Sequence, residues 1–88
     1  MENPVLEIRK DLGIGRAQFS VLLGVSYGIL SQTELGYPLT LPESVATGLE
    51  RLGFDREQIE QEYRAWRSSL LKRQEAAARE ALDALVAR

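Results

Sequence analysis

The sequence predicts an all-α fold, a compact domain of four to five short helices with an extended C-terminal helix. Apolar residues recur at intervals of three and four along much of the chain, which is the period of an amphipathic helix. Gly24 and Ser26 lie between two such stretches, as in a tight turn between short helices. No glycine or proline follows Gly53, so one long helix is expected there. The 88 residues suffice for one small domain with an appended element.

The composition excludes several kinds of function. The chain has neither cysteine nor histidine, which removes disulfides, thiol nucleophiles, imidazole acid–base chemistry and the usual zinc ligands. Because it also offers no nucleophile–base pair and no glycine-rich phosphate loop, we expect no enzyme, no metal and no cofactor. The first residues do not resemble a signal peptide, and no apolar run approaches the ~20 residues of a membrane span. These features predict a cytoplasmic protein without membrane contact.

The charge balance is unusual for a protein that binds nucleic acid. The chain has 11 Lys and Arg against 13 Asp and Glu, a formal net charge of −2. Residues 1–53 hold four basic and six acidic side chains, whereas residues 54–88 are balanced. Phosphate contacts supply most of the non-specific affinity for DNA, so this balance counts against strong DNA binding by one copy of the chain.

The first two helices are defined by their ends. Asn3 and Pro4 suit the cap and the first position of a helix that Gly13 ends. A second helix is expected from about Gly15 to Leu23. The apolar stripe of this second helix consists of Phe19, Leu22 and Leu23.

A third helix is expected from about Ser26 to Leu35, with Ser26 as its cap and Gly36 at its end. Val25 lies in the turn before it, where it can fill the angle between the second and third helices. Ile29 and Leu30 are expected to face inward. The helical period then turns four residues outward, namely Tyr27, Gly28, Ser31 and Gln32.

Two short helices joined by such a turn form a helix-turn-helix, and the chain resembles the lambda-repressor-like (Cro-type) family from about Ile8 to Ile59. The resemblance is carried by Phe19, Ser20, Gly24, Val25, Ser26, Leu30, Glu34 and Gly36, followed by Leu49-Glu50-Arg51-Leu52-Gly53. It implies a repressor-like, sequence-specific transcriptional regulator that binds double-stranded DNA as a homodimer. It also implies an ion pair between Arg9 and Glu34. The chain departs from the family pattern at Arg16, Ser20, Gly28 and Thr33.

The predicted DNA interface divides into base contacts and phosphate contacts. With the third helix in the major groove, bases are expected to meet Tyr27, Gly28, Ser31 and Gln32, of which Gln32 can form a bidentate pair with adenine. Phosphates are expected to meet Arg16, Gln18, Tyr37 and Thr40. No lysine or arginine lies on the outward face of the helix. The alternative is therefore a protein-interaction or assembly module that retains the fold with weak or no DNA binding.

Two further helices complete the prediction. Thr40 and Glu43 have the spacing of a capping box for a helix from about Leu41 to Leu52. Asp55 suits the cap of a final helix that would reach ~50 Å if it continued unbroken to the end of the chain. These assignments divide the chain into a DNA-binding domain at residues 1–54 and a helical extension at residues 55–88.

The extension carries the only large apolar stripe outside the predicted helix-turn-helix core. Its members repeat at the spacing of a coiled-coil seam and are Ile59, Tyr63, Trp66 and Leu70. We expect this stripe to join two copies of the chain, and the alternative is that Trp66 covers the core of its own domain. Beyond Leu71 the stripe drifts to Ala78, Leu82 and Leu85, and alanine replaces larger residues. The segment from Gln74 onward either lengthens the contact or frays.

Overall fold

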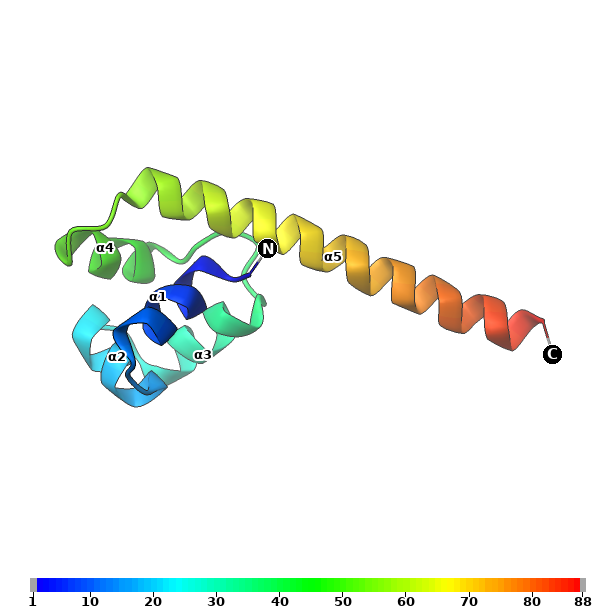
Figure 1. The fold of residues 1–88 in the computed structure, drawn as a ribbon, viewed down its shortest axis with the longest axis horizontal. Helices are drawn as coiled ribbons and strands as arrows, with labels where there is room; N and C mark the ends of the chain where they lie inside the picture. The colour runs from blue at the N-terminus through cyan, green and yellow to red at the C-terminus, as the bar shows by residue number, and fades with distance from the viewer. Residues whose placement is uncertain (1, 88) are drawn as a thin grey trace.

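Five helices follow one another along residues 2–87, the part of the chain that the computed structural model describes (Figure 1). They are α1 (Pro4–Leu12), α2 (Arg16–Leu23), α3 (Tyr27–Leu35), α4 (Glu43–Arg51) and α5 (Arg56–Val86). These residues contain no strand, so the predicted all-α class and the long C-terminal helix are confirmed. Within the same residues, no helix combines the length and the apolar character that crossing a membrane requires.

Three helices begin at the capping residues that the sequence predicts. The Asn3 side-chain oxygen accepts hydrogen bonds from backbone N–H groups in the first turn of α1. The Ser26 hydroxyl accepts one from the N–H of Ile29, at an N–O distance of 3.1 Å, where α3 begins. The Asp55 carboxylate does the same for Gln58 at 3.2 Å, where α5 begins. A cap of this kind stabilises a helix by ~1 kcal/mol, so local sequence alone fixes these three starts.

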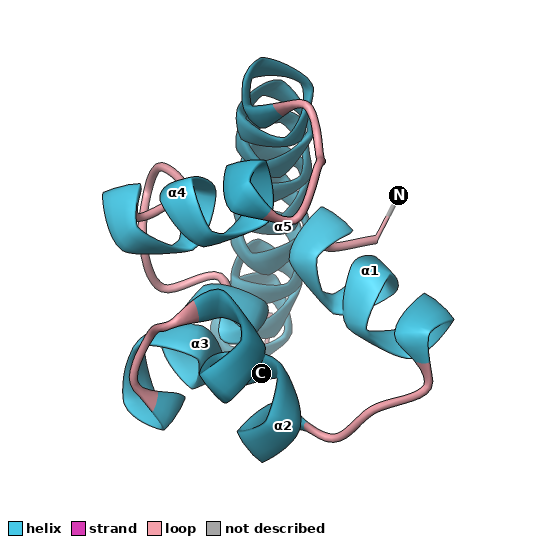
Figure 2. Ribbon diagram, turned by 90° about the vertical axis from the view of Figure 1, so that its left-hand side faces the viewer, coloured by secondary structure: helices cyan, strands magenta, loops and turns pink. Residues whose placement is uncertain are grey.

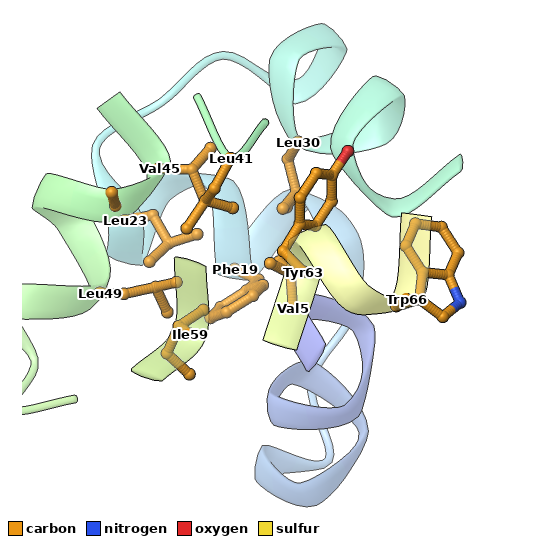
Figure 3. Close-up of a cluster of buried hydrophobic side chains, with 11 residues drawn as sticks. Val5, Phe19, Leu23, Leu30, Leu41, Val45, Leu49, Ile59, Tyr63 and Trp66 are labelled. Atoms are coloured by element: carbon orange, nitrogen blue, oxygen red, sulfur yellow. The ribbon is translucent and has the colours of Figure 1, made fainter. Parts of the chain in front are cut away.

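One hydrophobic core lies between the five helices, and every helix contributes to it (Figure 3). Its buried members are Val5, Phe19, Leu23, Leu30, Leu41, Val45, Ala46, Leu49, Ile59, Tyr63 and Trp66. Burial of a large apolar side chain contributes roughly 1.5–3 kcal/mol. Because the members come from all five helices, no single helix can be removed without opening the core.

The long helix α5 divides into two parts with different surroundings. Up to Leu70 it packs against α1 and α4, which lie on opposite sides of it, with α2 and α3 on a third side (Figure 2). Every residue from 71 to 87 is exposed. We call residues 71–86 the stalk, because they extend away from the other four helices (Figure 1). The stalk gives the molecule its elongated dimensions of 53 × 24 × 21 Å.

The apolar stripe at the start of α5 belongs to the core of its own chain. Tyr63 is completely buried, Ile59 and Trp66 are nearly so, and Leu70 packs against the core. The expectation that this stripe joins two copies is therefore corrected, and the alternative for Trp66 holds. A four-three-four repeat fits a groove within one chain as well as it fits a partner helix, so the spacing alone did not distinguish the two.

The same packing corrects the domain boundary expected after residue 54. Residues of α5 up to Leu70 share one core with the first four helices, because Ile59, Tyr63 and Trp66 are buried in it and α5 packs against α1 and α4. The core therefore extends to Leu70. What lies outside it is the stalk, which is about half of the extension expected from the sequence.

The start of α4 also differs from the prediction. The helix begins at Glu43, with Pro42 as its cap residue and no side-chain capping bond, so Thr40 does not cap it. A residue that precedes proline is disfavoured in the helical conformation, which keeps Leu41 out of the helix. Leu41 instead extends into the core, where it is 8% exposed.

Two apolar side chains expected to face inward are partly exposed. Leu22 is 46% exposed and Ile29 is 39% exposed, while Thr33 and Glu34 are buried beside Leu30. The inward arc of the short helix α3 is therefore partly polar. We expected Ile29 to face inward because isoleucine is more apolar than threonine and glutamate.

Candidate nucleic-acid interface

The turn between α2 and α3 has the geometry of a helix-turn-helix. Gly24 has a φ of +74°, a left-handed conformation that closes α2. The N–H of Val25 donates to the carbonyl oxygen of Ser20 at 3.0 Å, and Val25 packs against the core as predicted. Arg51 of α4 donates to the carbonyl oxygen of Leu23 at 2.7 Å, which satisfies another acceptor at the end of α2. The backbone, the core and α4 thus all hold the angle between α2 and α3.

The outward face of α3 brings together the residues predicted to meet bases. Tyr27, Gly28 and Gln32 are exposed and Ser31 is half-buried. Ile29, which is 39% exposed, also contributes to this surface. A Cβ atom at Gly28 would have no neighbour within 4 Å, so the backbone of α3 is open to solvent at that point. The face therefore offers an aromatic ring, an aliphatic side chain, a hydroxyl and an amide around an accessible backbone.

A buried carboxylate on the inner side of α3 links three helices. The Glu34 side chain is 2% exposed and accepts hydrogen bonds from Arg9 of α1 at both oxygens, at 2.8 and 2.9 Å. This bidentate pair confirms the ion pair that the family resemblance implies. Arg16 of α2 donates through Nε to the same carboxylate at 3.1 Å. Charge-assisted and bidentate hydrogen bonds are strong, so the carboxylate fixes α1 and α2 against α3.

The C-terminal end of α3 is also bound to the start of α1. The Nδ2 amide of Asn3 donates to the carbonyl oxygens of Thr33 and Glu34, at 2.9 and 3.1 Å. Sequence reasoning assigned Asn3 only its capping role. The signal that it missed is chemical, because an asparagine that caps through its oxygen still has two N–H donors to place.

Arg16, a predicted phosphate contact, is already engaged within the chain. Besides its bond to Glu34, its guanidinium lies over the ring of Tyr27, at 5.8 Å from the ring centroid. Hydrogen bonds to Glu34 and then to Tyr27 raise the pKa of Arg16 above its ordinary value. Arg16 therefore stays charged and spans the first turns of α2 and α3, with one third of its side chain exposed at their outer edge.

The other three predicted phosphate contacts lie at two places on the surface. The Gln18 side chain accepts a hydrogen bond from the N–H of Gly15 at 3.0 Å, so Gln18 caps α2. Tyr37 and Thr40 are exposed on the loop between α3 and α4. This loop is anchored by the hydroxyl of Tyr63, which donates to the carbonyl oxygen of Pro38 at 2.7 Å.

Sequence reasoning did not connect this loop with the arginines of α5. Arg64 lines a hollow of about 210 Å³ together with Thr40, Leu41 and Glu60. Arg67, one turn further along the same side of α5, has a buried Nε without a hydrogen-bond partner. Arg64 of α5 is therefore a cation beside Thr40, a predicted phosphate contact of the loop, and no signal in the linear sequence points to this.

Comparisons of the chain with protein-family models, with curated proteins and with solved structures find no match. Within residues 2–87, no group of three or more Asp and Glu side chains is placed to hold a metal ion. The features that bear on function are therefore the geometry of α2, the turn and α3, and the chemistry of the exposed face of α3.

Proposed function

We propose that this chain is a sequence-specific DNA-binding regulator that acts as a homodimer, with α3 as its recognition helix. The observation that carries the proposal is the combination of a rigid α2–turn–α3 unit with an outward face of α3 on which Tyr27, Gly28 and Gln32 are exposed. A helix held in this way is the element that enters a major groove in helix-turn-helix proteins. The buried Glu34 and the anchored turn keep that helix in one orientation.

The side chains of the face suit base recognition. Gln32 offers a donor and an acceptor on one amide, the arrangement that pairs with adenine, and Ser31 can donate or accept. Tyr27 and Ile29 supply apolar surface for a thymine methyl group. Gly28 lets the backbone of α3 approach the base edges closely, because it has no side chain.

The electrostatics of the face predict weak binding by one copy of the chain. Residues 27–41 contain no lysine or arginine, and the two arginines nearest to α3 are both paired with Glu34. Few phosphate contacts mean low affinity and a shallow dependence on salt concentration. Two copies on half-sites about one helical turn apart would raise the apparent affinity without new contacts, so the proposal includes a dimer.

The test is selection of a binding site from a library of random double-stranded DNA, followed by fluorescence anisotropy titrations of the selected duplex. We expect the variant Gln32→Ala to lose ~1–3 kcal/mol of binding free energy on the selected duplex and to bind an unrelated duplex unchanged. Gln61→Ala is the matched control, because Gln61 is an exposed glutamine on α5, outside the α2–turn–α3 unit. Equal losses on both duplexes would show that Gln32 does not read sequence.

A protein-interaction or assembly module is the second candidate function. The observation in its favour is the same shortage of cations, together with the exposed apolar residues Tyr27 and Ile29 on the face of α3. If selection enriches no DNA sequence at low salt, the DNA proposal fails. The face of α3 then becomes the candidate surface for a protein partner.

A further inference from the structure

The stalk is a helix without a covering partner within its own chain. None of its 16 residues belongs to the hydrophobic core or to the apolar side chains packed against it, and all of them are exposed. The stalk continues a helix that the core has already nucleated, and adding residues to a formed helix changes its stability little in water. A surface that covers one side of the stalk would therefore add most of its stability.

One side of the stalk is apolar and the rest is charged. At 100° per residue, Leu71, Ala78, Leu82 and Leu85 fall within one narrow stripe of the helix surface. Leu71, Leu82 and Leu85 are 53%, 55% and 61% exposed. Because the side chain of Ala78 at the centre of the stripe is small, a second helix can approach the stripe closely.

The charges of the stalk identify its partner. Residues 71–87 hold three basic and three acidic side chains, so the segment is neutral and gains nothing from phosphates or from a strongly charged protein. The charges are divided unevenly along the helix. Residues 71–78 hold Lys72 and Arg73 against Glu75, a net charge of +1, and residues 79–87 hold Arg79 against Glu80 and Asp83, a net charge of −1. A neutral helix with a basic end and an acidic end is complementary to itself in the antiparallel direction.

We propose that the stalk pairs with the stalk of a second copy of this chain as an antiparallel two-helix contact, with Ala78 at the twofold axis. Leu71 and Leu85 each lie seven residues from Ala78, or ~10 Å along the helix, so Leu71 of one copy meets Leu85 of the other. The same arrangement places the basic end of each stalk beside the acidic end of its partner. Parallel pairing would place like charges together.

The place where the stalk leaves the core supports this arrangement. Arg64 lies two turns before Leu71 on the same side of α5, and Arg64 lines the hollow with Thr40 of the α3–α4 loop. That loop exposes Tyr37 and Leu39, which are 68% and 73% exposed. The tip of the partner stalk, whose Leu85 meets Leu71, therefore points toward this loop, which follows Gly36 beside Trp66 and Leu70. An isologous contact of this kind repeats at both ends.

The inference concerns association of the chain with itself and stands without DNA binding. The first measurement is therefore sedimentation equilibrium of the full chain at tens of micromolar in the absence of DNA. We expect a dimer for the unmodified chain. A monomer at this concentration would overturn the proposal and leave the DNA-binding activity of α3 to be judged separately.

A pair of variants then locates the contact. Leu85→Glu places a charge in the stripe and is expected to raise the dimer dissociation constant about tenfold or more, with the far-UV circular dichroism of the folded core retained. Ala84→Glu adds the same charge to the same helical turn at about 130° from the centre of the stripe, outside it, and is expected to leave the dimer intact. Equal behaviour of the two variants would show that the stripe is not the contact.

The direction of the two stalks is tested by cross-linking. The chain contains no cysteine, so single cysteines can be introduced without background. Under an added oxidant, Ala78→Cys is expected to form a covalent dimer, because the two Ala78 positions meet at the axis. Leu71→Cys is expected not to do so, since the two positions lie at opposite ends of the contact. Equal cross-linking at both positions would indicate parallel stalks and overturn the antiparallel arrangement.

Discussion

Replacement of Gly36 by alanine is expected to destabilise the fold far more than an ordinary change at a helix end. Gly36 closes α3 with a φ of +84°, a conformation that costs an L-residue ~1–2 kcal/mol. A Cβ atom there would also lie 2.6 Å from the ring carbon Cη2 of Trp66 and 2.9 Å from Cδ2 of Leu70. Carbon atoms in good contact are ~3.5–4.0 Å apart, so the indole of Trp66 has to move by about 1 Å.

The second contribution can be estimated from the packing around Trp66. This indole is 8% exposed and lies against the ring of Tyr63, with ring centroids 5.7 Å apart, so it has little room to shift. Forced overpacking of a core costs ~1–3 kcal/mol. The two contributions together give ~2–5 kcal/mol for Gly36→Ala, and the free energy of unfolding of a chain this size is roughly 4–13 kcal/mol. The thermal midpoint should fall by at least ~8 °C.

Gly13→Ala is the matched control for this substitution. Gly13 closes α1 with a φ of +68°, but a Cβ atom there would have no neighbour within 4 Å. It therefore carries the backbone cost of ~1–2 kcal/mol without the overpacking. Urea unfolding followed by far-UV circular dichroism and by the fluorescence of Trp66, the only tryptophan, measures both variants. If Gly36→Ala costs no more than Gly13→Ala, the contact between Gly36 and Trp66 does not constrain the fold.

Three further predictions concern the core. Burial raises the pKa of Tyr63 above its ordinary value of 10.0. The neutral phenol therefore contributes its full stability below pH ~10, and this contribution is lost as the pH rises through the folded-state pKa. Tyr63→Phe should remove this alkaline loss and cost ~1 kcal/mol at neutral pH, which urea unfolding midpoints at neutral and at alkaline pH will measure. Glu34→Gln should cost up to ~3–5 kcal/mol, moderated by the partial exposure of its two arginines, while Glu60→Gln on the surface should cost under ~1 kcal/mol by the same urea assay. A chain that ends after Phe54 lacks the α5 part of the core and should show an unfolded circular dichroism spectrum; a helical, cooperatively melting fragment would contradict the packing described above.

Local signals predicted most of the helices of this chain. Asn3, Ser26 and Asp55 each have a side chain that satisfies the N–H groups of one helix start, and that interaction involves only neighbours in the sequence. Gly24 ended α2 for an equally local reason. Where local signals competed, one of them failed. The capping box at Thr40 gave way to the restriction that Pro42 places on Leu41.

The sequence predicted which residues lie on the surface of the candidate site, but not the contacts that these residues make with other helices. The period of α3 correctly placed Tyr27, Gly28 and Gln32 at the surface, because a helix leaves no choice once one buried residue is known. The engagement of Arg16 with Glu34 depends on how α2 approaches α3, and no spacing in the sequence encodes that distance. The packing of the α5 stripe into the core of its own chain could not be predicted for a similar reason. An apolar groove within the chain and one on a second copy fit the same spacing of apolar residues.

Because α5 runs without a break from the core into the stalk, it can act as a rigid lever arm. Trp66 and Leu70 of α5 rest on Gly36, the residue that closes α3, and α5 continues without glycine or proline into the stalk. A helix without such breaks resists bending, so a sideways displacement of the stalk tip turns α5 about its seat on the core. The stalk extends ~24 Å beyond that seat, so a small shift at Gly36 corresponds to a much larger one at the tip. Whatever holds the tip therefore sets the angle at which α3 is presented.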